Sequence, residues 1–420
     1  MTDVRPRPVT GDLDLSQDAF WALTPAARHA AYARLRAMAA PPYFNPRYSP
    51  FGVPERGYYA LARHADVAEA SRNPAVFSSA AGATSIFDLP VEFSEYFGSM
   101  INMDDPRHAR LRRIVSRAFT PKMIRKFEQN VRRTVTGIAD DLLAAGPCDF
   151  VQEVSARLPL QVICEMMGIG DEHYDMVLRN TSTILSGTDP ELNSQDVNEA
   201  LTRILTAGGE LAALVTELAE QRQAGYSDDL VSALTSANID GEQLTAAELA
   251  SFFILLVAAG TETTRNAISH ALVLLTEHPD QRALLLADLE GRIGPAVEEI
   301  VRYVSPVIWM RRTVTQDTVM NGHAYRTGDK VLLMFQAANR DESVFADPHR
   351  FDITRSPNPH VGFGSAGPHF CLGAHLARRE ITAIWRELLT RAPRIRAAAD
   401  PDYLQSSFIN GIKRLPCSID

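Results

Sequence analysis

Cys371 lies in a glycine-rich stretch, residues 363–373, that runs directly into a segment with helical character. Glycines such as Gly364 and Gly373 permit positive φ angles and close backbone approach, so the loop can fold over the sulfur and direct N–H groups at it. A helix N-terminus also favours thiolate over thiol. A cysteine in this setting can be the thiolate ligand of a haem iron, whereas a lone cysteine is more often buried and inert.

A second group of reactive residue types stands inside a long apolar segment, residues 251–275. This segment is apolar nearly all round, which predicts a helix that threads the centre of the protein. Gly260 and the adjoining threonines predict a local kink, because threonine hydroxyls can bond backbone carbonyls. A charged Glu262 is costly there unless it is used or paired. Glu262 and Thr263 are therefore either a functional pair or part of a structural salt-bridge cluster.

Four cationic side chains could together neutralise an acidic group in the interior. His108 and Arg112 stand four residues apart and share one face of a predicted helix. Arg312, with Arg311 as its alternative, lies in a predicted strand, and His369 precedes the cysteine by two residues. Each cation taken singly is more often a surface residue. Together they suit two carboxylates that enter the interior, because an unpaired buried charge costs several kcal/mol.

These motifs resemble the cytochrome P-450 superfamily, over nearly the whole chain. The stretch 363–373 is similar to its haem-binding signature, and the segment 259–264 is similar to its oxygen-activation motif. In one departure, Ser365 and Ala366 both separate Gly364 from Gly367, where the family's pattern has a single residue. The loop is one residue longer, and the packing of Phe363 near the sulfur can differ accordingly.

The resemblance implies a fold and a set of site residues. The fold is mainly α with small β regions, and haem b lies between a long central helix and the helix after the cysteine loop. Cys371 is implied as the axial iron ligand, and Glu262 with Thr263 as the proton relay. The residues implied to surround the haem are His108, Arg112, Arg312, His369, Phe363, Gly364 and Gly373. A structural network beneath the haem is implied for Glu299, Arg302 and Arg350.

The pair Glu299 and Arg302 stands at i, i+3 on a predicted helix and is weak evidence without the resemblance, because most such pairs are solvated surface salt bridges.

A cysteinate pushes electron density toward bound dioxygen, an effect for which this family is the usual example. The resemblance thus implies a monooxygenase that takes two electrons and O2 and forms water and a hydroxylated C–H bond. The chain carries no flavin module and no GxGxxG sequence, so we expect a ferredoxin and a ferredoxin reductase as partners. The alternatives are a peroxide-driven peroxygenase and a non-catalytic haem or lipid carrier with the same fold.

The predicted helix from Pro106 concentrates arginines on a net acidic protein, and we expect the ferredoxin to dock there. A merely solvated helix face is the alternative. The arginines concerned are Arg107, Arg110, Arg113 and Arg117.

Apolar residues near the motifs are candidates for the wall of a substrate pocket, although any one of them is more often plain core. The candidates are Phe97, Ile101, Val257, Ala258, Ile308 and Phe408. A mostly apolar pocket suits a lipid or terpenoid as the hydrophobic small-molecule substrate. The stretches 96–101, 104–108, 251–256 and 408–413 resemble actinobacterial members that hydroxylate methyl-branched lipids, isoprenoids and sterol side chains. That resemblance implies oxidation at a terminal methyl of a methyl-branched chain.

Composition is typical of a globular enzyme: 420 residues, 45% hydrophobic and 22% charged. No linker or repeat divides the sequence, so we expect one catalytic domain over 1–420. The net charge of −9 argues against nucleic acid as a partner. The start lacks a signal-peptide core, and the clean apolar run 252–260 is too short for a membrane anchor. Four scattered cysteines predict a cytoplasmic protein without disulfides.

Hydrophobic periodicity and turn residues predict the elements that must position these groups. Helices are predicted over 16–39 and 64–73, a strand over 58–61, and a long loop over 74–105. A run of helices is predicted from 106 to 278, with breaks at Gly146, Gly168, Gly187 and Asp240. Strands are predicted over 307–315, 319–325 and 331–335.

Overall fold

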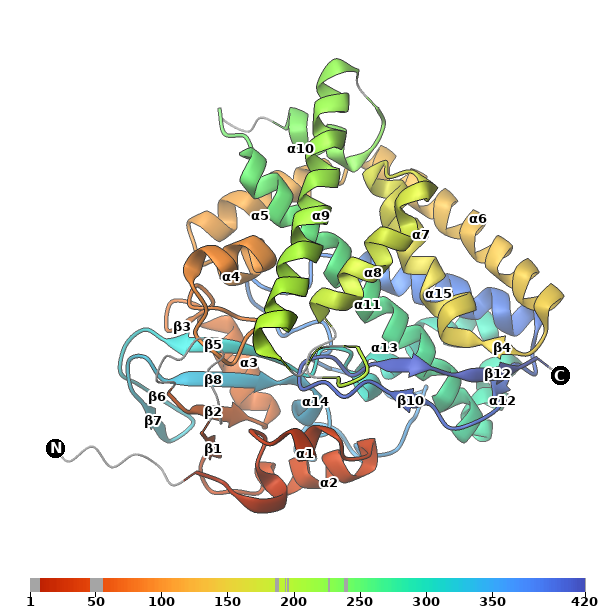
Figure 1. The fold of residues 1–420 in the computed structure, drawn as a ribbon. Helices are drawn as coiled ribbons and strands as arrows, with labels where there is room; N and C mark the ends of the chain where they lie inside the picture. Colours follow the sequence, from red (N-terminus) through yellow and green to blue (C-terminus); the bar gives the residue numbers. More distant parts are fainter. Residues whose placement is uncertain are drawn as a thin grey trace.

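The computed structural model describes residues 8–45, 56–185, 189–192, 194, 196–225, 227–237 and 241–419. Helices dominate the fold, and the strands gather mainly on one side of the helical body (Figure 1). The helices are α1 (Asp18–Trp21), α2 (Pro25–Arg36), α3 (His64–Arg72), α4 (Val91–Gly98), α5 (Arg107–Ala118), α6 (Pro121–Ala145), α7 (Arg157–Met167), α8 (Tyr174–Leu185), α9 (Val197–Ala224), α10 (Leu230–Ser236), α11 (Ala246–Glu277), α12 (Pro279–Ala287), α13 (Leu289–Val304), α14 (Phe335–Ala338) and α15 (Ala374–Arg391).

The strands form small sheets. The largest has the order β1-β2-β8-β5-β3, in which only β2 and β8 run parallel. Two hairpin-like pairs, β6-β7 and β10-β11, and the three-stranded sheet β4-β12-β9 complete the described strands. Their bounds are β1 (Tyr43–Phe44), β2 (Tyr58–Leu61), β3 (Phe77–Ser78), β4 (Cys148–Asp149), β5 (Trp309–Val314), β6 (Thr318–Met320), β7 (His323–Tyr325), β8 (Lys330–Met334), β9 (Arg396–Ala397), β10 (Asp402–Tyr403), β11 (Ile412–Arg414) and β12 (Pro416–Ser418). The strands predicted late in the chain are confirmed.

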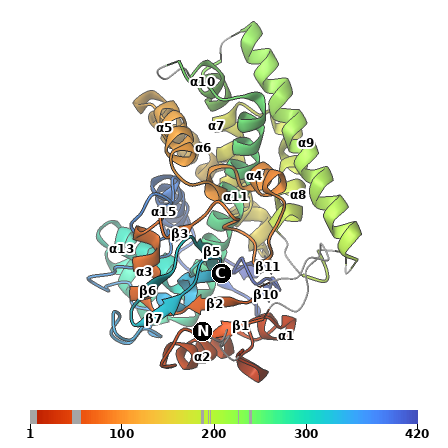
Figure 2. The same cartoon turned by 90° about the vertical axis from the view of Figure 1, so that its left-hand side faces the viewer.

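Helix α11 forms the centre of the molecule, as its apolar sequence predicts. It begins at a capping box, in which the Thr245 side chain accepts from the Glu248 N–H while the Glu248 carboxylate accepts from the Thr245 N–H. α4, α7, α8, α9, α13 and α15 all pack against it (Figures 1 and 2). α11 is long and apolar enough to cross a membrane, but 56% of its apolar window is buried inside the protein, as in a core helix.

The single helix predicted over 16–39 is wrong, because the structure has α1 and α2 there. The break follows from local chemistry. Thr24 caps α2 by accepting from the Ala27 N–H, and Pro25 at the first helical position cannot continue a preceding helix. Periodicity alone joins the two segments because both bury apolar residues, among them Phe20 and Tyr32, in one cluster.

The long loop predicted over 74–105 is also only partly correct. It contains β3, α4 and a 3-10 turn over Ser99–Asn102. Helix α4 is short and packs on α11, so tertiary contacts stabilise it more than its own sequence does.

The helix breaks at Gly146 and Gly168 are confirmed, and Gly168 adopts the left-handed conformation at the end of α7. The predicted breaks at Gly187 and Asp240 lie outside the described residues. A further break separates α5 from α6, where Thr120 caps the new helix.

Candidate active site

A largely apolar cavity lies at the heart of the molecule, beside α11. Residues of α5, α7, α11, α15, β5 and the loop 362–373 line it. Cys371 lies on one wall and Thr263 on another. The cavity therefore brings together segments that are more than one hundred residues apart in sequence.

The cysteine loop is held by its own backbone. The Cys371 N–H donates to the Phe363 carbonyl at 3.0 Å, and Gly364 turns the chain with a φ of 81°. Gly367 passes so close to α3 that a Cβ there would lie 2.2 Å from the Ser71 carbonyl oxygen. The exposed surface of Cys371 opens on the cavity, although the residue is enclosed by the fold.

The groups around Cys371 shift the pKa of its thiol in opposite directions. Burial raises the pKa of the thiol, while a hydrogen bond from the backbone of Gly373 and the charges of Arg112 and Arg378 lower it. Helix α15 begins directly after Gly373, so its free N–H groups lie on the same side as the sulfur. A cation bound next to the sulfur would lower the pKa of the thiol further and so favour the thiolate.

The two members of the predicted proton relay diverge in the structure. Thr263 lines the cavity, and its hydroxyl donates to the Ala259 carbonyl at 2.7 Å. Glu262 points away from the cavity, where it is paired with Arg265 at 2.9 Å and accepts from Ser182 at 2.9 Å. The sequence allowed either a functional role or a structural salt bridge for Glu262, and the structure contains the salt bridge. Of the two residues, only Thr263 lines the cavity.

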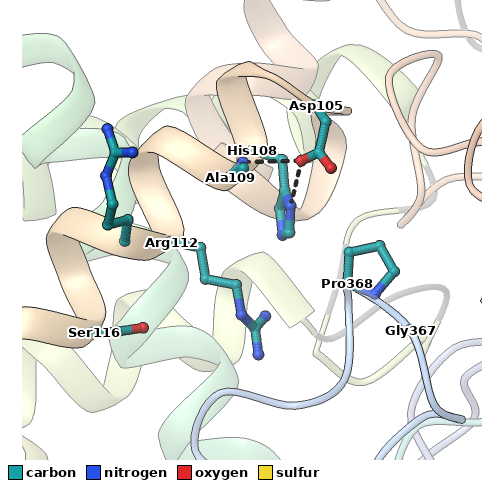
Figure 3. A pocket seen from close by; sticks show the side chains of 8 residues that line it. Asp105, His108, Ala109, Arg112, Ser116, Gly367 and Pro368 are labelled. Atoms are coloured by element: carbon teal, nitrogen blue, oxygen red, sulfur yellow. Dashed lines mark hydrogen bonds and ion pairs between the residues drawn. The ribbon is translucent and has the colours of Figure 1, made fainter.

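The four predicted cations converge at one end of the cavity. The rings of His108 and His369 lie 4.2 Å apart between centroids, and the buried Nε2 of His108 has no hydrogen-bond partner in the described chain. Figure 3 shows His108 and Arg112 projecting from α5 beside Pro368. Arg312 is 6% exposed and also lines the cavity.

One acid lies against this cluster, because Asp105 Oδ1 is 3.3 Å from Nδ1 of His108 (Figure 3). Burial, followed by Arg312, His108 and Arg112, lowers the pKa of His369 to about 3. Arg311, the alternative to Arg312, faces elsewhere and binds Asp88 and the carbonyls of residues 85–87.

Residues 56–391 match the cytochrome P-450 protein family. The chain belongs to the cytochrome P-450 family. It is 47% identical over 408 residues to a methyl-branched lipid omega-hydroxylase of Mycobacterium tuberculosis, covering 96% of this chain and 94% of the relative. It is 39% identical to a steroid C26-monooxygenase of Mycolicibacterium smegmatis, over 86% of this chain and 83% of that one. A Mycobacterium marinum cytochrome P-450 in complex with pseudoionone superposes with a TM-score of 0.92 at 40% identity, covering 99% and 100% of the two chains.

The protein is therefore a cytochrome P-450 monooxygenase, and its cofactor is haem b. Like the family, it acts on hydrophobic substrates with O2 and redox partners. The residues of the cavity fit the cofactor. A porphyrin is a flat apolar ring with two carboxylates. The cavity offers apolar walls, the sulfur of Cys371 and a cationic end at which the buried Nε2 of His108 has no hydrogen-bond partner in the described chain.

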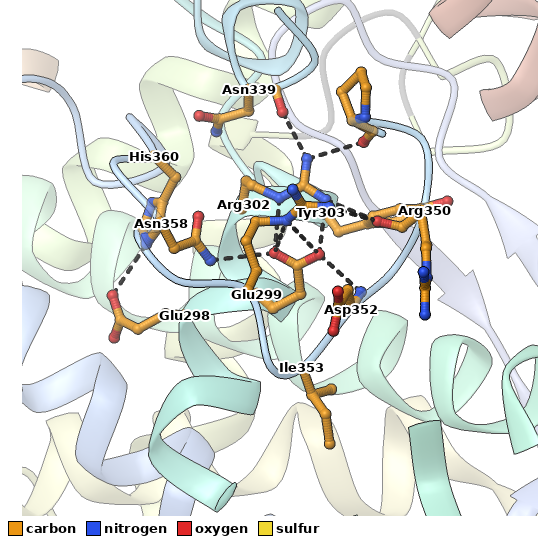
Figure 4. A network of polar contacts seen from close by, with 12 residues as sticks. Glu298, Glu299, Arg302, Tyr303, Asn339, Arg350, Asp352, Ile353, Asn358 and His360 are labelled. Carbon is orange, nitrogen blue, oxygen red and sulfur yellow. Dashed lines mark hydrogen bonds and ion pairs between the residues drawn. The ribbon is translucent and has the colours of Figure 1, made fainter. Parts of the chain in front are cut away.

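The predicted network beneath this site is present with one change of residue. Glu299 and Arg302 are both fully buried and form two hydrogen bonds of 2.7 Å (Figure 4). The second arginine is Arg355, whose Nε lies 3.2 Å from Glu299. The prediction of Arg350 is wrong, because its side chain is exposed and only its backbone carbonyl accepts bonds from the other two arginines.

Of the predicted pocket residues, Ile101 lines the cavity and the others do not. Val257 and Ala258 lie on parts of α11 that do not border the cavity. Helical spacing counted back from Thr263 would have selected the lining residues, which are Phe252, Leu255, Leu256, Ala259 and Gly260.

The remaining three pocket predictions fail for different reasons. Ile308 is fully buried in another cluster while Val307 lines the cavity, because β5 begins only at Trp309 and strand alternation does not extend back to these residues. Phe408 packs edge-on against Trp309. Phe97 packs against its own helix and the backbone of α9.

The arginines of α5 are mostly paired within the protein. Arg107 binds Glu95 at 2.6 Å, Arg110 binds Glu248 at 2.7 Å, and Arg113 binds Glu242 at 3.1 Å. Arg117 is exposed and has no ion pair in the described chain. The face is thus less cationic than its sequence suggests.

Proposed function

We propose that this cytochrome P-450 hydroxylates a terminal methyl group of a methyl-branched lipid. Similarity to a methyl-branched lipid omega-hydroxylase over 96% of the chain carries this assignment. The apolar wall formed by α11 supports it, because Leu255, Leu256 and Ala259 offer surface to a hydrocarbon chain and no charge.

The same proposal gives each residue of the cavity a task. Cys371 holds the haem iron as a thiolate, and the haem, when bound, supplies the oxygen-activating chemistry. Arg112 and Arg312 face the propionates as charge partners, and His108 and His369 donate to them. Phe363, Gly364 and Gly373 enclose the sulfur and limit its access to water.

Thr263 would deliver protons on the side opposite the cysteine. Its hydroxyl bonds the Ala259 carbonyl one turn earlier, so it can release that bond and donate into the cavity without moving the helix ends. Glu262 can take part only if it leaves Arg265 and Ser182. An ion pair between two mostly buried groups resists such a movement.

Electrons would come from a ferredoxin and its ferredoxin reductase. The exposed Arg117 and the cationic rim near Arg112 support docking of an acidic partner at α5. We assign the protein to the cytoplasm and the chain 1–420 to one catalytic domain.

The test is product analysis after turnover with reduced ferredoxin, using a methyl-branched lipid and its straight-chain counterpart. One buried methyl contributes up to ~1 kcal/mol, so the branched chain should bind several-fold more tightly, with oxidation at a terminal methyl. Exclusive in-chain oxidation, or equal binding of both chains, would defeat the substrate assignment. Turnover driven better by peroxide than by ferredoxin would favour a peroxygenase.

A pair of variants on α11 ties the result to the cavity. Ala259→Leu adds bulk to the lining and should weaken binding of the branched lipid, read as a substrate-induced shift of the haem spectrum. Ala247→Leu makes the same change on an exposed turn of α11 and should leave binding unchanged.

A further inference from the structure

Two cysteines that the haem site does not use face each other across the sheet β4-β12-β9. Cys148 in β4 is the register partner of Cys417 in β12, and their Sγ atoms lie 3.6 Å apart. The two strands lie side by side near the C-terminus (Figure 1). The cysteines are 269 positions apart in sequence, so only the fold brings them together.

The backbone of the two strands holds both sulfur atoms on one face of the sheet. The Phe150 N–H donates to the Leu415 carbonyl at 2.9 Å. Because pair types alternate along an antiparallel ladder, Cys148 and Cys417, two positions further on, also form a hydrogen-bonded pair. The Cα atoms of such a pair are typically about 5.5 Å apart, which is a usual spacing across a disulfide. Side-chain rotation can therefore bring the sulfur atoms to bonding distance without a change of strand register.

The two thiols differ in their access to solvent. Cys148 is half-buried, whereas Cys417 is 1% exposed and lies in the central strand, where β9 pairs with its other edge. A small oxidant from solvent therefore meets the sulfur of Cys148 first. Burial, followed by the neighbouring Cys417, raises the pKa of Cys148 to about 12. Since the thiolate is the reactive form, the pair is slow to oxidise and stays as two thiols at low oxidant levels.

We propose that Cys148 and Cys417 form a reversible disulfide when the protein is exposed to hydrogen peroxide. The Cys148 thiolate attacks the peroxide O–O bond, which breaks to give a sulfenic acid and, after protonation, water. The Cys417 thiol then attacks the sulfenic sulfur and displaces a second water, which completes the S–S bond. Two thiols are thus oxidised to a disulfide while hydrogen peroxide is reduced to two molecules of water. A dithiol reductant reverses the change by thiol–disulfide exchange and is itself oxidised.

The bond would act as a staple between distant parts of the chain. It would join β4 to β12 across 269 positions, which restricts the unfolded chain and so stabilises the fold. Hydrogen peroxide forms when two electrons reduce O2 without hydroxylation of a C–H bond, so a monooxygenase can generate this oxidant itself. Transient disulfides in cytoplasmic proteins usually serve catalysis or redox sensing. The staple would therefore close when turnover fails to give product, whichever lipid is the substrate.

The test exposes the haem-bound wild type to a small excess of hydrogen peroxide. Catalase then removes the peroxide, N-ethylmaleimide blocks free thiols in denaturant, and the peptides are mapped by mass spectrometry without reduction. We expect one cross-linked pair, Cys148 with Cys417, that has lost two hydrogen atoms and regains them after dithiothreitol. Absence of this pair in the folded protein, or oxidation of Cys148 to a sulfinic acid in its place, would overturn the proposal.

Two matched variants tie the cross-link to the staple. Cys148→Ala should lose the cross-link, whereas Cys164→Ala, the same change in α7 outside this sheet, should keep it. The urea midpoint of each peroxide-treated protein is then compared before and after dithiothreitol. The reductant should lower the midpoint of the wild type and of Cys164→Ala, and leave that of Cys148→Ala unchanged. A wild-type midpoint that does not respond, or an equal response in Cys148→Ala, would overturn the stabilising role.

Discussion

Replacing Arg355 with methionine should strongly destabilise the segment that leads to the cysteine loop. The Arg355 side chain is 9% exposed, and its Nε binds Glu299 at 3.2 Å. Its guanidinium also donates to the carbonyls of Ala346 at 2.7 Å, Asp347 at 3.2 Å and Arg350 at 3.1 Å. Three bonds to neutral acceptors contribute ~1 kcal/mol each, and the bond to the carboxylate about 2 kcal/mol.

The methionine side chain offsets part of this lost free energy of unfolding, because it buries apolar surface. Burial of a methionine stabilises by about 1.5 kcal/mol. The net expectation for Arg355→Met is a loss of roughly 3–4 kcal/mol, within the range for breaking a buried ion pair. Arg350→Met is the matched control. Its side chain is exposed and makes no hydrogen bond or ion pair in the described chain, so the change should stay within about 0.5 kcal/mol.

Urea titrations followed at the haem provide the assay. The quantities compared are the urea midpoint for haem release and the fraction of protein with the thiolate band of the reduced carbon monoxide complex. A protein with a tightly bound cofactor does not unfold in a simple two-state transition, so the urea midpoints are compared at one protein concentration. Equal destabilisation by Arg350→Met would refute the assignment of Arg355 to the network. A neutral Arg355→Met would refute the view that this network anchors the loop.

Three further outcomes are expected. Arg312→Gln should speed haem transfer to apomyoglobin several-fold. Arg311→Gln should not, because the guanidinium of Arg311 faces away from the cavity. Equal rates for the two variants would count against Arg312 as a propionate partner. Thr263→Ala should divert electrons to peroxide or water. Thr261→Ala should keep the wild-type product yield, because the Thr261 hydroxyl bonds the Val257 carbonyl away from the cavity. The quantity measured for both variants is the amount of product formed per electron pair. Burial raises the pKa of Glu380 on α15, so its contribution to stability is present below its ordinary pKa of 4.5 and is lost as the pH rises through about 8. Glu380→Gln should therefore gain in thermal stability over the wild type across that interval, by up to ~5 kcal/mol, and a pH-independent difference would contradict the shift.

Local sequence determined the features that depend on a few neighbouring residues. The cysteine loop is one, because Gly364 adopts a positive φ and the helix after Gly373 begins at once. The central helix is another, since a long run that is apolar on every face is typical of a helix buried in the core. The family resemblance favoured Arg312 over Arg311, and the two side chains do face in different directions.

Tertiary structure decided which side chains meet. Arg350 and Arg355 lie in one short irregular stretch, and only the path of that stretch over α13 buries Arg355 and exposes Arg350. A helix that is apolar on every face gives no sign in its hydrophobic pattern of which face borders the cavity, so only spacing from Thr263 separates Ala259 from Val257. Glu380 resembles any charged residue of an amphipathic helix until α11 and α13 cover it. Burial and pairing belong to contacts between segments distant in sequence, and such contacts leave no local periodic pattern.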